Sequence, residues 1–551
     1  MIMKTQNSAN LSRTQHAVQL VGPDKLVFNR SKEVFLPIGH QILCRVEAVG
    51  LCFSDLKLLK QFSSHVRKGA VVSGIDAGVL NEIPSYVPGE AATVPGHETV
   101  IKVEAVGTDV KNFKPGCRFI IQADYRWLHT AGSNAAFGYN FEGALQEYVL
   151  MDERIMFSPQ GGSMLIPVSG KLSASAAALI EPWACVENDY ANSERRKLKP
   201  EGRILVVADV KVPECVLANF FNRYGNSALE KSNITEVSGN DISELAEAGY
   251  DDVIYFGSDP AVVEILFEKV SANGLLNIVL CGSRFGRGVS AAVGRVHYGG
   301  IRIVGTTGSD PAESMEYIPK TGEVRAGDKL NVVGAAGPMG TMHVIRNICQ
   351  GIEGISIFAG DQDESRLAAL SKKAEPLAKK HNVRYQPYNP TKEKLTDTFN
   401  YTVLMVPVSE LVNASVKSSA RGGIIDIFAG LPATVTAELD LDAYIEKQLY
   451  FVGTSGSVPE DMEAVLVKTE SGQLDTNISV GAVCGLDSAI DGIRAVENRS
   501  IAGKIIVYPA CKGLGLTRLE KLQEKMPQVA ECLNNGLWTK QAEEKLLASF
   551  K

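Results

Sequence analysis

The sequence contains no apolar run of the roughly 18 residues that a membrane-spanning helix requires. Its first 18 residues, MIMKTQNSANLSRTQHAV, are polar and lack the apolar stretch of a secretory signal. The ten cysteines are scattered without a short-spaced framework, which favours reduced thiols over disulfides. The net charge is −7, with acidic and basic residues mixed along the chain and no basic stripe for a polyanion. We therefore expect a cytoplasmic protein with neither membrane nor nucleic acid as partner.

The 551 residues are enough for roughly three domains of ordinary size, and 45% hydrophobic with 22% charged residues is typical of globular proteins. Up to about residue 180, short β-type runs such as QILCRVEAVG (41–50) and ETVIKVEAVG (98–107) are broken by glycine and proline. From about residue 200, strand-like apolar runs alternate with helix-length stretches. This order predicts a β-rich domain followed by parallel α/β sheets.

Part of the α/β region is repeated. VGTTGSDP (304–311) and VGTSGSVP (452–459) match at six of eight positions, at an offset of 148 residues. At the same offset, VSANGLLNIVLCG (270–282) falls on SSARGGIIDIFAG (418–430). A shared, gap-free offset predicts two tandem copies of one α/β domain.

The second copy carries a nucleotide-binding pattern. The strand-like KLNVVG runs into a turn with Gly334, Gly337 and Gly340, and Pro338 and Met339 open the following helix. Such a turn lets backbone N–H groups approach a pyrophosphate at a helix N-terminus. Asp361 lies 21 residues past Gly340, where a carboxylate binds the adenosine ribose and favours NAD over NADP, although the nearby Arg366 leaves NADP open. The other interpretation is a structural glycine turn with a solvated aspartate.

The corresponding turn of the first copy lacks these glycines. Asp209, Lys211 and Pro213 stand in the segment VVADVKVPEC. Because their side chains would fill the pyrophosphate position, we expect a copy that does not bind this cofactor. It is either structural or has acquired another ligand.

The β-rich region contains a set of potential metal ligands. Cys52, His97 with Glu98, and Glu181 occur in the segments GLCFSD, PGHE and LIEPWACV. A catalytic zinc takes about three protein ligands and keeps an open position for a substrate oxygen, which thiolate, imidazole and carboxylate together can provide. Each residue alone is more often a core residue than a ligand, and only the ordered set argues for a site.

These segments, together with VEAVGTDVKNFKPGCRF (103–119) and GALQEYV (143–149), resemble the zinc-containing medium-chain dehydrogenase/reductase family, nearest its sorbitol, threonine and sugar-alcohol dehydrogenase branch. The resemblance implies that Cys52 and His97 bind zinc and that Glu181 or Glu98 adds a carboxylate, directly or through water. It also implies that Ser54 contacts the substrate hydroxyl and starts a proton relay, and that Asp55 orients a ligand.

The chain also departs from the family. The segment 122–141 contains no cysteine where many relatives carry a four-cysteine lobe, so we expect one zinc ion. Ile101, Cys117 and Lys57 replace residues that are common in the family. A long loop between Asp55 and His97 carries the basic residues His65, Arg67 and Lys68, which are either a site for a phosphate or carboxylate or a solvated basic turn.

The predicted architecture is α/β, with a GroES-like β-rich catalytic domain and two tandem Rossmann-type doubly wound parallel sheets. The expected boundaries are 1–195 for the catalytic domain, completed by 465–511, then 196–325 for the degenerate copy, 326–464 for the NAD-binding copy and 512–551 for a helical tail. Relatives dimerise through edge strands of the cofactor-binding domain, so we expect the two copies to pair as an internal pseudo-dimer. The sequence does not decide whether the chain also forms homo-oligomers.

The predicted function is a zinc-dependent, NAD-dependent alcohol or polyol dehydrogenase. It would transfer a hydride between NAD and a secondary alcohol or ketone of a polyol, sugar or sugar phosphate. One alternative is a redox-neutral epimerase or lyase that retains its NAD, and another is a non-catalytic sensor or scaffold.

Overall fold

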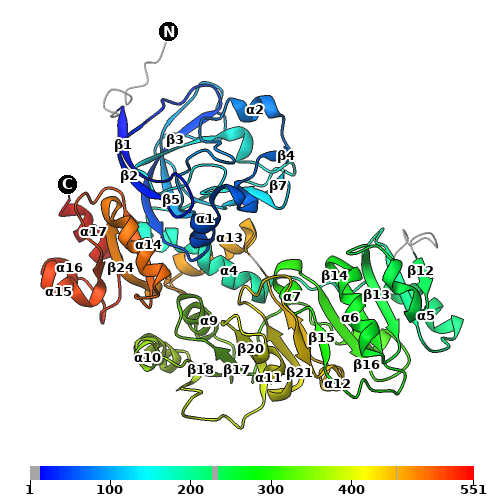
Figure 1. The fold of residues 1–551 in the computed structure, drawn as a ribbon. Helices are drawn as coiled ribbons and strands as arrows, with labels where there is room; N and C mark the ends of the chain where they lie inside the picture. Colours follow the sequence, from blue (N-terminus) through cyan, green and yellow to red (C-terminus); the bar gives the residue numbers. More distant parts are fainter. Residues whose placement is uncertain (1–12, 226–233, 455, 551) are drawn as a thin grey trace. The chain divides into compact units, whose positions relative to one another are not determined.

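A computed structural model describes residues 13–225, 234–454 and 456–550 (Figure 1). The first twelve residues of the polar N-terminal segment lie outside these ranges. The chain divides into two compact units, Met1–Ala184 with Ser457–Lys551 and Cys185–Gly456. Within the described ranges, every helix is too short or too polar to cross a membrane.

The first unit is built around an eight-stranded sheet in the order β10-β6-β5-β3-β25-β24-β26, with β9 also pairing with β3. Alternating apolar residues in these strands form one core, to which the N-terminal and C-terminal parts of the chain both contribute. The strands are β3 (Gln41–Gly50), β5 (Glu98–Val106), β6 (Arg118–Ile121), β9 (Tyr148–Asp152), β10 (Leu165–Pro167), β24 (Val480–Gly485), β25 (Lys504–Tyr508) and β26 (Thr517–Arg518).

Two smaller sheets and several helices complete this unit. The sheets pair β1 (Thr14–Leu20) with β2 (Leu26–Glu33), and β7 (Asp124–Thr130) with both β4 (Val71–Ser73) and β8 (Asn134–Ala136). The helices are α1 (Ser54–Gln61), α2 (Ala77–Asn81), α3 (Ala174–Ala178), α13 (Pro459–Glu470), α14 (Ala489–Glu497), α15 (Leu522–Lys525), α16 (Pro527–Ala530) and α17 (Lys540–Ala548), and α4 (Ile180–Ala191) begins here and continues into the second unit.

The C-terminal tail, predicted to be helical, contains α15, α16 and α17 and is anchored by buried side chains. Trp538 is buried, and its indole N–H donates to the Ser175 hydroxyl at 3.1 Å. Glu543 of α17 is also buried and accepts a hydrogen bond from Ser175 at 2.7 Å. The tail is therefore bound to the first turn of α3 by hydrogen bonds between buried side chains.

The second unit contains two parallel sheets. The first has the order β12-β11-β13-β14-β16, and the second has the order β19-β18-β17-β20-β21-β23, which is the strand order of a doubly wound nucleotide-binding fold. The strands of the first sheet are β11 (Ile204–Ala208), β12 (Ile234–Val237), β13 (Tyr250–Phe256), β14 (Val270–Val279) and β16 (Arg302–Thr306). Those of the second are β17 (Lys329–Val333), β18 (Ser356–Gly360), β19 (Arg384–Tyr388), β20 (Phe399–Leu404), β21 (Ser419–Asp426) and β23 (Tyr450–Val452).

Helices follow most of these strands, as is usual for parallel pairing, although β19 leads into β20 without one. In the first part of the unit they are α5 (Glu214–Tyr224), α6 (Pro260–Lys269), α7 (Gly294–Gly299) and α8 (Ala312–Glu316). In the second part they are α9 (Pro338–Cys349), α10 (Glu364–Lys380), α11 (Glu410–Ser418) and α12 (Leu441–Glu446).

The repeated sequence segments occupy matching places in the two sheets. The longer repeat forms β14 in one sheet and β21 in the other, and the shorter repeat begins in the edge strands β16 and β23. The sheets share one hydrophobic core, and β15 (Val289–Ala291) pairs antiparallel with β22 (Ala437–Leu439). The Tyr444 hydroxyl also donates to the carbonyl of Ile303 at 2.9 Å. The two α/β parts therefore pack as one unit.

Candidate active site

The metal-binding candidates come together because β3 and β5 are antiparallel. Their register pairs Gly50, the last residue of β3, with Glu98, the first residue of β5. Cys52 follows two residues after Gly50, and His97 directly precedes Glu98. The absence of a side chain at Gly50 matters here, because a Cβ at this position would overlap the Glu98 carboxylate.

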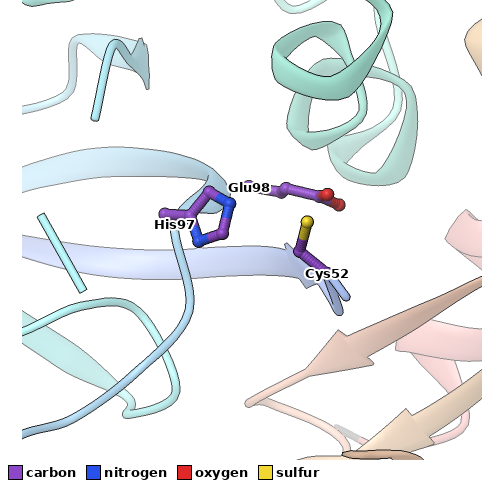
Figure 2. A group of neighbouring side chains, drawn as sticks. All are labelled: Cys52, His97 and Glu98. Carbon is purple, nitrogen blue, oxygen red and sulfur yellow. The ribbon is translucent and has the colours of Figure 1, made fainter. Parts of the chain in front are cut away.

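Cys52, His97 and Glu98 each direct one potential ligand atom into a shared space, and these atoms all lie within 4.8 Å of one another. Figure 2 shows the Cys52 sulfur beside the Glu98 carboxylate, with the His97 ring close to both. His97 and Glu98 are buried, whereas Cys52 is half-buried. One oxygen of Glu98 is buried and has no hydrogen-bond partner among the described residues. A set of sulfur, nitrogen and oxygen donors with an unsatisfied oxygen fits a zinc ion.

Asp55 and Ser54, at the start of α1, surround this set. The Asp55 carboxylate lies 3.1 Å from His97 Nδ1, and its other oxygen accepts the backbone N–H of Cys52 at 3.3 Å. Ser54 Oγ lies 3.1 Å from Cys52 Sγ and 3.4 Å from His97 Nε2. Asp55 therefore holds the ring with Nε2 directed towards the sulfur and the serine hydroxyl.

The negative charge of the group Cys52, His97 and Glu98 is offset by a lysine that the sequence analysis did not predict to be part of the site. Lys504, the first residue of β25, is buried and forms an ion pair with Glu98. Burial alone would lower the pKa of Lys504, but the nearby Glu98, Cys52 and Glu181 raise it above its usual range. For His97, burial also opposes the charged form, yet the Asp55 carboxylate raises its pKa well above the ordinary value.

Glu181 lies in the first turn of α4 and is half-buried. It does not belong to the group of three ligand atoms, although its charge acts on Lys504. Glu98 therefore has the geometry of a direct ligand. A role for Glu181 as a further ligand or through water stays a prediction.

Tyr139 is a second residue that sequence reasoning missed. It is buried, its ring centroid lies 6.1 Å from that of His97, and Ser54 is near enough to act on the pKa of its hydroxyl. Burial raises the pKa of the Tyr139 hydroxyl, which keeps the group neutral. No motif marks this tyrosine, because its position beside Ser54 depends on the folding of the segment after β8.

The basic residues of the long loop are largely used by the protein itself. Lys68 is buried and donates to the carbonyls of Val87 and Ala91. His65 Nδ1 accepts the backbone N–H of Arg67 at 3.2 Å, and burial lowers the pKa of His65 to about 4. These contacts favour a structural role over a site for an anion.

The glycine turn of the second unit has the predicted form. It connects β17 to α9, Gly334 has a φ of +83°, Gly337 is the N-cap residue and Pro338 opens the helix, followed by Met339. A Cβ on Gly340 would overlap the carbonyl oxygen of Gly334, so glycine at this position lets the helix start against the turn. The nearest atom to a Cβ on Gly337 would be 3.8 Å away, which leaves this backbone open.

Asp361 follows the last residue of β18, as expected. One carboxylate oxygen accepts the backbone N–H of Ala336 in the glycine turn at 3.0 Å, and the other accepts the N–H of Asp363 at 3.0 Å. Asp361 is thus fixed beside the turn. Arg366, in the first turn of α10, lies 3.5 Å from the Asp363 carboxylate.

The equivalent turn of the first sheet is closed by a side chain. Asp209 accepts the backbone N–H of Gly239 at 3.0 Å and the Tyr255 hydroxyl at 2.6 Å. The carboxylate therefore joins the ends of neighbouring strands where the second sheet has a glycine turn.

Comparison with known proteins agrees with this geometry. Residues 39–160 match the model of the alcohol dehydrogenase GroES-like domain. D-altritol 5-dehydrogenase of Agrobacterium fabrum (strain C58 / ATCC 33970) is 26% identical over 183 residues, which are 31% of this chain and 44% of the relative. An uncharacterized zinc-type alcohol dehydrogenase-like protein of Escherichia coli (strain K12), YdjJ, is 25% identical over 191 residues, which are 31% of this chain and 48% of that protein.

The chain is thus similar to zinc-type alcohol dehydrogenases, and its residues 39–160 match their GroES-like domain. It spans about half the length of these curated relatives. Among solved structures, 2R,3R-butanediol dehydrogenase from Bacillus subtilis is similar with a TM-score of 0.52 at 16% identity, covering 90% of this chain and all of that one. The medium-chain dehydrogenase fold, with a GroES-like domain and parallel α/β sheets, is thereby shown. It is the fold of alcohol dehydrogenase-like oxidoreductases.

Proposed function

We propose that this chain is a zinc-dependent medium-chain dehydrogenase that transfers a hydride between NAD and a secondary alcohol or ketone of a polyol, sugar or sugar phosphate. The observation that carries the proposal is the convergence of Cys52, His97 and Glu98, with Asp55 orienting the histidine. The name of one relative, a dehydrogenase of the polyol D-altritol, supports the substrate class.

Cys52, His97 and Glu98 would hold the zinc ion through sulfur, nitrogen and oxygen. When bound, zinc lowers the pKa of an alcohol hydroxyl, and NAD accepts the hydride from the alcohol carbon. The hydrogen bond to Asp55 keeps the Nδ1 proton in place and leaves the Nε2 lone pair for a ligand bond. Lys504 offsets the charge of the buried Glu98.

Ser54 would accept the proton of the substrate hydroxyl. Its Oγ lies beside two of the proposed ligands, Cys52 and His97, and is therefore within reach of a group at the open position of the site. Tyr139, whose hydroxyl pKa is influenced by Ser54, is the next group through which the proton would move.

Gly334, Gly337 and Gly340 would receive the pyrophosphate of the nicotinamide cofactor at the N-terminus of α9, where Pro338 and Met339 begin the helix. Asp361 supports NAD, because a carboxylate beside the turn accepts hydrogen bonds from ribose hydroxyls and repels a 2′-phosphate. The first sheet, closed by Asp209, would be structural, and its packing against the second sheet supports the internal pseudo-dimer.

The test is a panel of polyols, sugars and sugar phosphates incubated with NAD and protein of known zinc content, while NADH absorbance and substrate consumption are followed together. We expect NADH to form with at least one secondary alcohol, to stop when zinc is removed and to resume when zinc is restored. Consumption of a substrate without NADH would instead identify a redox-neutral epimerase or lyase. No turnover by zinc-loaded protein that binds NAD would favour a sensor or scaffold.

A further inference from the structure

A second cluster of potential metal ligands lies inside the second unit. It consists of Asp189 in α4, His343 in α9 and Asp426, the last residue of β21. Each offers one ligand atom, and these atoms all lie within 4.8 Å of one another. Asp426 and His343 are fully buried, and Asp189 is 4% exposed. The cluster is separate from Cys52 and its neighbours, which belong to the other unit.

Two members of the cluster have unsatisfied polar atoms. Three buried atoms have no hydrogen-bond partner within the described part of the chain. They are the two carboxylate oxygens of Asp426 and the Nε2 atom of His343. Buried polar atoms without partners are rare, because losing water without gaining a hydrogen bond costs free energy. Burial raises the pKa of the Asp426 carboxyl well above its ordinary value and lowers that of His343 to about 3. The three buried atoms without partners are the observation that points to a bound ligand.

The repeat shows that a carboxylate at this strand position is not required by the fold. Asp426 pairs with Val452 of β23, and Asn277 of β14 pairs with Val304, which corresponds to Val452 at the offset of 148 residues. Asn277 is buried, donates to the carbonyl of Pro311 at 3.0 Å and accepts from the Ser314 hydroxyl at 2.7 Å. The second copy thus carries a carboxylate where the first copy has a neutral amide with hydrogen-bond partners.

The positive charges near the cluster are already paired with other acids. Arg346 lies 3.0 Å from Glu187 and 2.6 Å from Glu323, and Arg302 lies 2.8 Å from Glu194. These ion pairs reduce the positive charge that the two guanidinium groups offer to the cluster, and Arg302 acts on Asp426 only through its charge. A buried Asp426 carboxylate therefore still requires a cation or a proton.

One ring nitrogen of His343 is already in a hydrogen bond. Its Nδ1 atom lies 2.8 Å from the Tyr190 hydroxyl, which also accepts a hydrogen bond from Asn347 at 2.7 Å. In the tautomer that carries the ring proton on Nδ1 and donates it to Tyr190, Nε2 is the atom left for a ligand. The Tyr401 hydroxyl is also buried without a partner among the described residues, and the charge of Asp426 acts on it.

We propose that Asp189, His343 and Asp426 bind a divalent transition-metal ion that stabilises the second unit. One imidazole nitrogen and two carboxylate oxygens suit zinc, manganese or iron(II), whereas magnesium and calcium prefer oxygen donors alone. Two aspartates balance the charge of a divalent ion. The ion would join α4, α9 and β21, and because the site is closed to solvent its role is structural.

The first test counts zinc ions in the full-length protein after loading with zinc and extensive dialysis. We expect two ions per chain in the wild type, one in Asp426→Asn and two in Asp252→Asn. The last variant is a matched control, because Asp252 is a buried aspartate of the same unit that pairs with Arg195 at 2.6 Å. Equal zinc content in all three proteins, with Asp426→Asn as stable as the wild type, would show that the two aspartates share a proton and bind no metal.

The second test needs no variant and covers the case in which Asp426→Asn fails to fold. Crystals of the zinc-loaded wild-type protein are measured on both sides of the zinc absorption edge. We expect an anomalous peak between Asp189, His343 and Asp426, besides any peak at Cys52. A peak at Cys52 alone would overturn the proposal and leave the proposed dehydrogenase site intact, whereas a peak only at the new cluster would do the reverse.

Discussion

At the scale of single residues, the site around Cys52 depends on hydrogen bonds made by residues that are not themselves proposed ligands. Asp55 contacts both the His97 ring and the backbone of Cys52, so one carboxylate positions two proposed ligands. Lys504 contacts the third, Glu98. The consequences of losing Asp55 and Lys504 differ, because one positions ligand atoms and the other offsets a charge.

Replacing Asp55 with asparagine should weaken zinc binding. The neutral amide no longer favours the Nδ1–H form of His97, and loss of such a contact typically lowers metal affinity by about 10–100-fold. Competition with a coloured chelator measures the affinity. Asp109→Asn, an exposed change in the same unit, is the control and should leave the affinity unchanged. Equal affinity of Asp55→Asn and the wild type would contradict the positioning role.

Replacing Lys504 with methionine should destabilise the protein. The change leaves the buried Glu98 carboxylate without its positive partner, and breaking a buried ion pair in this way costs about 3–5 kcal/mol. Denaturant unfolding of the zinc-free protein measures the loss. Lys60→Met removes the more exposed ion pairs with Asp24 and Glu497 and should have little effect. If both variants unfold at the same denaturant concentration, Lys504 does not offset the Glu98 charge.

At the scale of elements, two glycines of the turn between β17 and α9 have different roles, because one is needed for folding and the other is proposed to be needed for cofactor binding. Gly340→Ala should destabilise the protein, because its Cβ would overlap the Gly334 carbonyl oxygen. Gly337→Ala should fold normally, since its Cβ has no neighbour closer than 3.8 Å, but should bind NAD more weakly because the methyl group points into the space proposed for the pyrophosphate. Thermal unfolding and NAD titration measure the two effects. Normal NAD affinity in Gly337→Ala would place the cofactor elsewhere.

The loop between α1 and β4 should make stability depend on pH. Burial, helped by Arg67 and Lys57, lowers the pKa of His65 to about 4 from an ordinary value of 6.5. The unfolded state therefore binds more protons between these values, and stability is lost as the pH falls from about 6.5 to about 4. His65→Asn can still accept the Arg67 N–H but does not titrate, so it should lose less stability over this range. Urea unfolding of both proteins at several pH values measures the difference. If the wild type and His65→Asn lose the same stability between pH 6.5 and pH 4, the pH dependence does not come from His65.

At the scale of the whole molecule, short-range patterns predicted more than long-range contacts. Cys52, His97 and Glu98 lie near the ends of two strands that the sequence already indicated, and their antiparallel register brings them together. The glycine turn and Asp361 are likewise adjacent to predicted strands. Such residues are recognisable because a local motif fixes their position.

The contacts that could not be predicted join distant parts of the chain. Lys504 is 406 residues from its partner Glu98, and nothing in the sequence around it marks a buried ion pair. Asp426 resembles any other polar residue of a strand until its neighbours in α4 and α9 are known. Tyr139 is similar, since its contact with Ser54 depends on the path of an irregular segment. Burial and tertiary proximity decide these roles, and neither can be read from composition or spacing.

The transfer of a hydride is tested most directly with an isotope. The best alcohol from the substrate panel is prepared with deuterium on the carbon that carries the reacting hydroxyl, and the zinc-loaded protein converts it with NAD. We predict that the deuterium is recovered in the nicotinamide ring of NADH, and that Cys52→Ser forms no labelled NADH. Deuterium that returns to the organic product, with no labelled NADH released, would contradict a dehydrogenase and indicate a redox-neutral enzyme.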